Sequence, residues 1–136
     1  MKLVFTASVM DLLHEGHINL LKKMKAEGDL VLVVLHDGFT TFENKRKLPI
    51  ENLEKRTRNL IDTGLVDIIR YTFEKEPVKA FKKIIKDYGD KFELLFMRGN
   101  DWLEYPAKSI LDKNNIPVKI IEYTKEISSS KLRNEL

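Results

Sequence analysis

The sequence contains no cysteine, only three histidines and no long hydrophobic segment. Without cysteine the chain can form no disulfide, thiolate nucleophile or cysteine metal site, and cysteine content gives no indication of the redox compartment. No apolar stretch approaches the roughly 20 residues that a membrane-spanning helix needs. The N-terminal residues MKLVFTAS also lack the apolar region and the small-residue cleavage site of a signal peptide. We therefore expect a cytoplasmic protein that does not contact a membrane.

Neither sign of charge dominates, because 24 Lys and Arg stand against 21 Asp and Glu and give a net charge of +3. The two tight basic runs, 45–47 and 55–58, have no aromatic residues beside them, so a nucleic-acid partner is not expected. A solvated face or a small anionic ligand remains as the reason for these runs. With 136 residues, 43% of them hydrophobic, the chain is expected to form one domain over residues 1–136.

Short apolar segments alternate with helical patterns along the whole chain. The strand-like segments are 3–9, 30–36, 66–72, 93–99 and 117–123, and the helical segments are 17–28, 51–63, 77–89, 106–115 and 128–136. This alternation predicts an α/β fold, namely a single Rossmann-like, doubly wound domain with a five-stranded parallel sheet. Ligands of such sheets bind at the carboxyl ends of the strands.

The hydrophobic pattern of two helical segments predicts which side chains face the core. On segment 17–28 these are Ile18, Leu21 and Met24. On segment 51–63 they are Leu53, Leu60 and Ile61, and Arg56 borders this stripe. An arginine at the edge of a core needs an anionic partner, so we expect either a carboxylate or a phosphate beside Arg56.

His14 and His17 fall where the first strand passes into the first helix. Their spacing of three residues is close to one helical turn, so both rings can point the same way. Gly16 lets the backbone approach a ligand, and a helix N-terminus suits a phosphate. A neutral imidazole donates one hydrogen bond and can take up positive charge near pH 7. Taken alone, the pair could equally be surface or metal-binding histidines.

Two further segments could contribute to an anion site at the same sheet edge. Lys45 and Lys47 lie in the loop after the second strand. Ser128, Ser129 and Ser130 begin the C-terminal helical segment, where their hydroxyl and amide groups could hold a phosphate. A plain helix cap is the alternative for these serines.

The order of these motifs resembles that of a known family. DLLHEGHINLL (11–21) is similar to the H-x-G-H signature of the nucleotidyltransferase superfamily that includes class I aminoacyl-tRNA synthetases. ISSSK (127–131) resembles the I-S-T-T-K type signature of small cytidylyltransferases, and MRGNDW (97–102) resembles the G-D-D-W stretch of glycerol-3-phosphate cytidylyltransferases. The likeness covers essentially the whole chain.

The resemblance implies a reaction in which CTP and a phosphorylated alcohol give a CDP-alcohol and pyrophosphate. Mg²⁺ would be bound through the nucleotide phosphates, with no metal ligand from the protein, and relatives are often homodimers. The resemblance assigns catalysis to His14, His17, Lys47 and Arg56. It assigns nucleotide binding to Ser8, Val9, Met10, Asp11, Gly16, Lys45, Gly99, Asp101, Ile127, Ser128, Ser129 and Ser130. For Asp11, a structural carboxylate that orients the loop is the alternative.

The acceptor is less well defined, because the sequence departs from the family pattern. Ser8-Val9-Met10-Asp11 replaces G-T-F-D, and two family arginines are absent, with Gly64 and Tyr123 in the affected segments. Our candidates for the acceptor site are Asp37, Trp102, Tyr105 and Tyr123. The three aromatic residues could face a cationic head group such as choline or ethanolamine, or they could simply pack.

Two other functions remain open. One is an ATP-dependent adenylyltransferase that acts on a phosphorylated cofactor precursor. The other is a nucleotide-binding module without catalysis, a possibility raised by the changed loop at residues 8–11.

Overall fold

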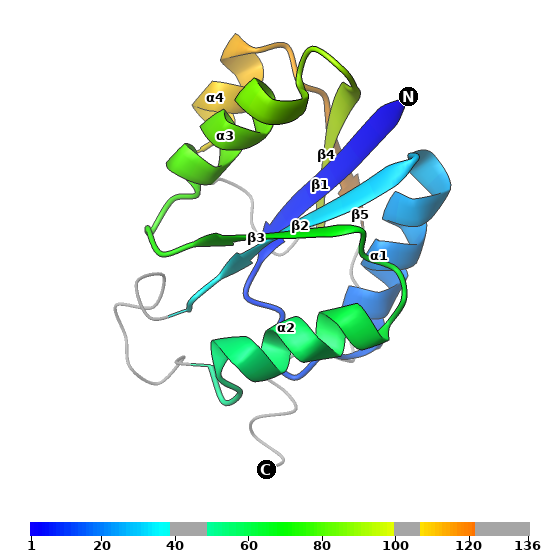
Figure 1. Cartoon of the computed structure of the whole chain (residues 1–136), viewed down its shortest axis with the longest axis vertical. Helices are drawn as coiled ribbons and strands as arrows, with labels where there is room; N and C mark the ends of the chain where they lie inside the picture. The colour runs from blue at the N-terminus through cyan, green and yellow to red at the C-terminus, as the bar shows by residue number, and fades with distance from the viewer. Residues whose placement is uncertain (39–48, 100–106, 122–136) are drawn as a thin grey trace.

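The computed structural model describes residues 1–38, 49–99 and 107–121. One parallel sheet lies between two layers of helices (Figure 1). The strands are β1 (Lys2–Ser8), β2 (Leu30–His36), β3 (Ile68–Thr72), β4 (Glu93–Gly99) and β5 (Val118–Ile121). The helices are α1 (Glu15–Glu27), α2 (Leu53–Asp62), α3 (Val78–Tyr88) and α4 (Lys108–Lys113). The predicted α/β fold with a five-stranded parallel sheet is confirmed.

The strand order is β3-β2-β1-β4-β5, and every neighbouring pair is parallel. After β1 the chain adds β2 and then β3 on one side of β1. It then crosses to the other side of β1, where it adds β4 and then β5. The direction of winding therefore reverses between β1 and β4. In open α/β sheets a ligand binds beyond the carboxyl ends of the strands at this reversal. For this chain that position lies beyond Ser8 and Gly99.

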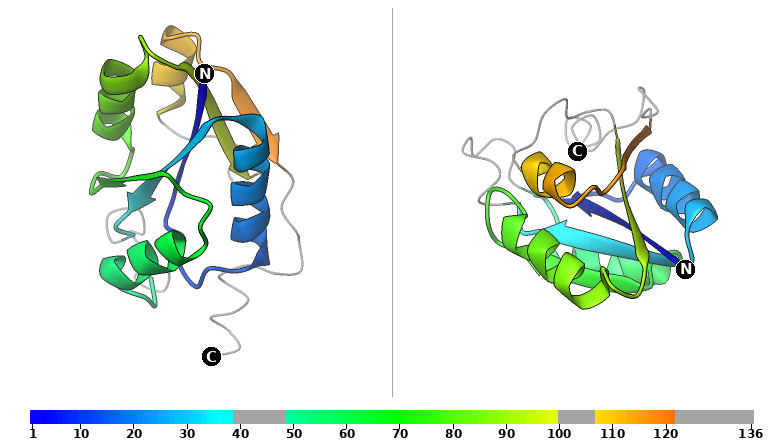
Figure 2. Two further views of the ribbon diagram at one scale, coloured as in Figure 1. Left: turned by 45° about the vertical axis from the view of Figure 1, so that its right-hand side comes forward. Right: turned by 90° about the horizontal axis from the view of Figure 1, so that it is seen from above.

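The sheet has a hydrophobic core on each face. Helices α1 and α2 cover one face of the sheet and α3 and α4 cover the other (Figure 2), and their side chains pack into the two cores. In β2, Leu32 and Val34 enter the core beneath α3 and α4, whereas Val31, Val33 and Leu35 enter the core beneath α1 and α2. All five are completely buried. This two-sided burial explains why the segment is apolar without alternation.

The helices differ from the predictions at their ends and at two of the positions predicted to face the core. In α1, Leu21 and Met24 are buried as predicted, but Ile18 is only half-buried and Leu20 enters the core instead. Helix α1 begins at Glu15, two residues before the predicted start, because His14 caps it. In α2 the prediction that Ile61 faces the core is wrong: Leu60 is completely buried, but Ile61 is 61% exposed. Consecutive helical residues are about 100° apart, so a helix that directs Leu60 inward turns Ile61 toward solvent. The predicted C-terminal helix lies outside the described residues.

Within the described segments, no helix combines the length and the apolar character needed to cross a bilayer.

Candidate active site

The two histidines of the H-x-G-H segment together cap the N-terminus of α1. His14 Nδ1 accepts a hydrogen bond from the Gly16 N–H at 3.0 Å, and His17 Nδ1 accepts one from the His14 N–H at 3.3 Å. This is a capping box with an imidazole in both positions. The rings stack, with their centroids 3.8 Å apart and their planes 21° apart. The prediction that both rings can point the same way is confirmed.

This reciprocal cap also selects the tautomer of each ring. A main-chain N–H can only donate, so each Nδ1 must offer a lone pair. Each neutral imidazole then carries its proton on Nε2. The cap therefore presents two Nε2–H donors on adjacent rings, which suits a phosphate oxygen on which charge develops. The Gly16 N–H already donates a hydrogen bond to His14. Gly16 can therefore contribute to ligand binding only by letting the ligand come close to the backbone.

Burial keeps both imidazoles neutral. It lowers the pKa of His17 to about 3, assisted by the nearby His14 and opposed by the Asp11 carboxylate. Burial also lowers the pKa of His14 from its usual value. Protonation would in addition place a proton on Nδ1 and break the cap. The expectation that these rings take up charge near pH 7 is therefore replaced by a pair of neutral donors.

The loop between β1 and α1 holds the four residues predicted to face the nucleotide. Met10 and Leu12 adopt left-handed backbone conformations, with φ of 53° and 49°. The Ser8 Oγ accepts a hydrogen bond from the Met10 N–H at 3.3 Å, so Ser8 shapes the turn. The Met10 side chain is 1% exposed and belongs to the core beneath α1 and α2. Any contact of Met10 with a nucleotide must therefore come from its backbone.

Asp11 ties this loop to the segment that begins α2. Its carboxylate accepts hydrogen bonds from the N–H groups of Ile50 at 2.9 Å and Glu51 at 3.0 Å. In return, the Glu51 carboxylate accepts from the Leu12 N–H at 2.9 Å. These bonds favour the structural alternative for Asp11 over direct contact with a nucleotide.

Arg56 is completely buried on the inner side of α2. Its guanidinium donates to the backbone carbonyls of Val9, His36, Asp37 and Glu51, at 2.6–3.0 Å. The expected hydrogen-bonding partner, a carboxylate or a phosphate, is thus replaced by carbonyl oxygens among the described residues. Burial lowers the pKa of Arg56, and the carboxylates of Asp11, Asp37 and Glu51 oppose this effect from nearby.

The carboxyl end of β2 contains a buried histidine that sequence reasoning left unassigned. His36 Nδ1 accepts from the Gly38 N–H at 2.9 Å, and Nε2 lies 2.6 Å from the carbonyl oxygen of Glu74. The carboxylate of Asp37 lies 3.0 Å from Nδ1. The signal that could have found His36 is its place as the last residue of the most apolar strand, at the edge where ligands bind. Asp37, predicted to bind the acceptor, lies at this same edge.

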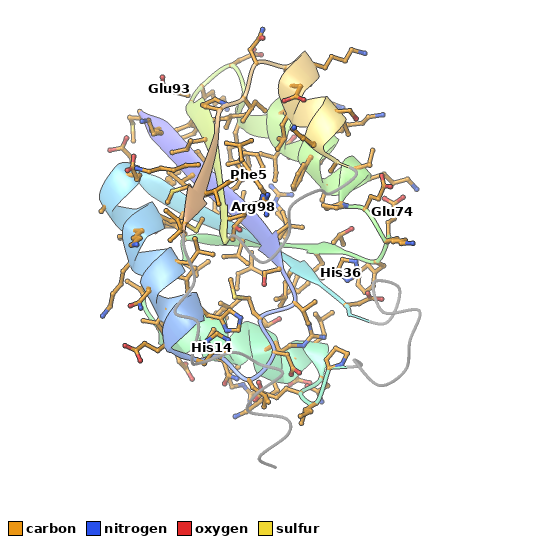
Figure 3. The ribbon with its side chains drawn as sticks, turned by 180° about the vertical axis from the view of Figure 1, so that it is seen from behind. Phe5, His14, His36, Glu74, Glu93 and Arg98 are labelled. Carbon is orange, nitrogen blue, oxygen red and sulfur yellow. The ribbon has the colours of Figure 1, made fainter. Side chains whose placement is uncertain are left out.

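Figure 3 shows His14 at the start of α1 and His36 at the end of β2, at one end of the sheet. Gly99 ends β4, the strand that neighbours β1 across the reversal point of the winding. The structure thus brings together Ser8, Val9, Met10, Asp11, His14, Gly16, His17, Asp37, Arg56 and Gly99 at the carboxyl ends of β1, β2 and β4. The remaining predicted site residues lie outside the described residues: Lys45, Lys47, Asp101, Trp102, Tyr105, Tyr123, Ile127, Ser128, Ser129 and Ser130.

This geometry matches a known family. The model of the cytidylyltransferase-like family matches residues 5–135. The chain belongs to this family. It is 32% identical over 137 residues to the glycerol-3-phosphate cytidylyltransferase of Bacillus subtilis, with 100% of this chain and 98% of that protein covered. It is 30% identical to the enzyme of the same name from Staphylococcus aureus, with 100% and 96% covered. The predicted enzyme class, a cytidylyltransferase, is confirmed at the level of the family.

Other relatives show how widely this fold is used. The chain is 30% identical to the bifunctional protein HldE of Wolinella succinogenes, but it spans only 26% of that longer protein. Among solved structures, a lipopolysaccharide core biosynthesis protein from Thermoplasma volcanium superimposes with a TM-score of 0.65 at 28% identity. That comparison covers 91% of this chain and 97% of the other.

Proposed function

We propose that this protein transfers CMP from CTP to a small phosphorylated alcohol and releases pyrophosphate. The observation that carries the proposal is the pair of Nε2–H donors that the reciprocal cap holds at the start of α1, beside the reversal point of the sheet. The two full-length relatives named glycerol-3-phosphate cytidylyltransferase support CTP as the donor and a phosphorylated alcohol as the acceptor.

In the proposed reaction, an oxygen of the acceptor phosphate attacks the α-phosphorus of CTP in line. The new P–O bond forms as the bond to the β-phosphate oxygen breaks, and pyrophosphate leaves with that electron pair. No covalent intermediate with the protein forms. Catalysis then consists of positioning the reactants and stabilising charge on the phosphoryl oxygens. His14 and His17 serve as neutral hydrogen-bond donors and give up no proton in the step.

We propose that basic and hydroxyl groups from other segments of the chain bind the triphosphate. Lys45, Lys47 and Ser128 to Ser130 are proposed to hold it, with Gly99, Asp101 and Ile127 near the nucleotide. In the described part of the chain, no three His, Asp or Glu residues lie close enough to hold a metal ion. We propose that Mg²⁺ would be held through the oxygens of the triphosphate, as the family resemblance implies, where it would neutralise charge.

The test is an assay of pyrophosphate release with Mg²⁺, each of the four NTPs and a panel of phosphorylated alcohols. We expect CTP to support turnover that is lost in His14→Asn, a variant that keeps the helix cap. Turnover with ATP instead would favour the adenylyltransferase. Tight CTP binding without pyrophosphate release for any acceptor would favour the non-catalytic module.

The acceptor is best identified by kcat/KM for glycerol 3-phosphate, phosphocholine and phosphoethanolamine. We propose a cationic acceptor, because two family arginines are absent and the aromatic residues Trp102, Tyr105 and Tyr123 could together face a cationic head group. A preference for glycerol 3-phosphate would show that those arginines are dispensable. We also propose that the protein is a homodimer, and light scattering should then give about twice the chain mass of 15.9 kDa.

A further inference from the structure

Arg56 is one of the largest completely buried side chains of the described protein, and its contacts are unusual for a buried charge. Nε donates to the Glu51 carbonyl at 3.0 Å. One terminal nitrogen donates to the carbonyls of Val9 at 2.9 Å and His36 at 2.6 Å, and the other donates to that of Asp37 at 2.8 Å. Four of the five N–H groups of the guanidinium are therefore used on backbone carbonyls.

These four carbonyls come from three segments that are far apart in the sequence. Val9 belongs to the loop that leads to His14, and His36 and Asp37 stand at the carboxyl end of β2. Glu51 precedes α2 and is itself bonded to Asp11 and Leu12 of the first loop. One planar side chain thus fixes the spacing between the segment that leads to the histidine pair and the segment that holds Asp37.

We propose that Arg56 is a positioning residue rather than a ligand of a substrate phosphate. It sets the distance between the histidine pair, which would contact the transferring phosphoryl group, and the β2 end, which would contact the acceptor. This proposal rests on the function proposed above and replaces the phosphate contact that the family resemblance implies for Arg56. The residue acts on catalysis only through the two segments that it joins.

Burial and geometry argue against direct contact with a phosphate. The Arg56 side chain has no exposed surface, and a phosphate would have to take its N–H donors away from the four carbonyls that already accept them. The chemistry of the four acceptors also requires arginine. Its flat fork directs donors along fixed, diverging lines, whereas lysine has three donors on one nitrogen and cannot reach four separate carbonyls.

The first test compares Arg56→Lys and Arg56→Gln with Leu60→Ala. Leu60 is the buried α2 residue one turn further along, so Leu60→Ala lowers the melting temperature without touching the four carbonyls. Each variant is assayed at a temperature at which circular dichroism shows it to be folded. We expect kcat to fall about 10²-fold in both Arg56 variants, because small misplacement of reacting groups is costly. In Leu60→Ala, kcat should stay within a few-fold of the unsubstituted protein.

The distribution of the loss between kcat and KM distinguishes positioning from phosphate binding. A phosphate ligand would give a raised KM for one phosphate-bearing substrate, largely restored by the positive charge of Arg56→Lys. That outcome, or an equal loss of kcat in Leu60→Ala, would overturn the proposal.

A second test does not depend on the proposed reaction. Amide hydrogen exchange should become faster in Arg56→Lys at residues 9–14 and 36–38, and it should be unchanged in the interior of α1. Faster exchange spread evenly over the chain, or no change in these two segments, would contradict the positioning role. If the protein shows no transferase activity but hydrogen exchange becomes faster in these two segments only, the proposed function is wrong. The conclusion that Arg56 positions the two segments would still hold.

Discussion

At the scale of single residues, the two histidines have a structural role and a proposed chemical role that use different atoms. Nδ1 of each ring accepts a hydrogen bond from the backbone at the start of α1, and Nε2 of each ring is the donor that we propose contacts the transferring phosphoryl group. The structural role predicts a loss of stability when either ring is removed. The chemical role predicts a loss of turnover. A substitution that supplies an acceptor in place of Nδ1, but no donor in place of Nε2, separates the structural role from the chemical role.

His14→Asn should retain stability and lose turnover. Asparagine is among the best N-cap residues, and its side-chain oxygen can replace Nδ1 as the acceptor for the Gly16 N–H. It cannot place a donor where Nε2 lies. We expect kcat to fall about 10²–10³-fold, the usual effect of removing one donor to a developing charge. The melting temperature, measured by circular dichroism, should stay close to that of the unsubstituted protein.

The matched control is His14→Ala, which loses both roles. Its turnover should equal that of His14→Asn, and its free energy of unfolding should be lower by about 1 kcal/mol through loss of the cap. Near-normal turnover in His14→Asn would show that His14 does no more than cap the helix.

The buried histidines should also make stability depend on pH. The native pKa of His17 is about 3, and its value in the unfolded chain is about 6.5. Between these values the unfolded state binds a proton that the native state excludes, so the free energy of unfolding falls as the pH falls. For this one residue the slope should be about 0.7 kcal/mol per pH unit at pH 6.5 and rise to about 1.4 kcal/mol per pH unit at pH 4.5, as measured by urea unfolding.

His17→Asn provides the comparison for this pH effect. It keeps an acceptor for the His14 N–H but has no group that titrates in this range. The pH slope should be shallower in the variant, and an unchanged slope would show that the pKa of His17 is the same in the native and the unfolded protein.

At the scale of elements, α2 offers a direct test of which side chains build the core. Leu60 and Ile61 are adjacent, and both read as core residues in the sequence, yet only Leu60 is buried. Leu60→Ala should lower the free energy of unfolding by about 2–5 kcal/mol. Ile61→Ala should change it by no more than about 0.5 kcal/mol. Urea unfolding measures both, and comparable losses in the two variants would contradict the orientation of α2.

The strands that are buried on both faces were predicted most accurately from the sequence. The bounds of β2 and β4 agree with the structure, because runs such as LVLVVLH can be accommodated only where both faces of a strand are covered. Helix ends were less predictable, since they depend on side-chain caps. A histidine at the N-cap of α1 is outside the usual set of Ser, Thr, Asp and Asn.

Gly64 shows how one departure from the family pattern has a local cause. It follows the end of α2 with φ of 71°, a conformation that favours glycine. An arginine side chain would find open space there, but its backbone would be strained. The turn after α2 therefore accounts for glycine at this position, whichever acceptor the protein uses.

At the scale of the whole molecule, the winding reverses between β1 and β4, where open α/β sheets bind their ligands, and we propose that CTP binds at this edge. Calorimetry should show tighter binding of CTP than of ATP. UTP is the closest control, because it differs from CTP only at the hydrogen-bonding edge of the pyrimidine. A site built for one base leaves polar groups unpaired against another. Equal affinities for CTP and ATP would refute cytidine specificity.

The candidate site was only partly predictable from the sequence. Spacing and strand position were enough to place His14 and His17 together at the correct sheet edge. The contacts of Arg56 were not predictable, because its partners are backbone carbonyls, which every residue has and no motif records. The same reason hides the contribution of His36, which bonds to backbone groups of Gly38 and Glu74.

The backbone contacts of Arg56 have a consequence for how this protein can evolve. Because the guanidinium recognises the oxygen of Val9 and not its side chain, a mutation at this codon leaves the contact in place. A change of side chain at residue 9 could therefore accumulate by drift while this contact was kept. Ser8 and Met10 are more constrained, because the turn uses the Ser8 Oγ and the Met10 side chain is buried in the core. Paralogues that acquire new substrates should vary at residue 9 and retain the arginine.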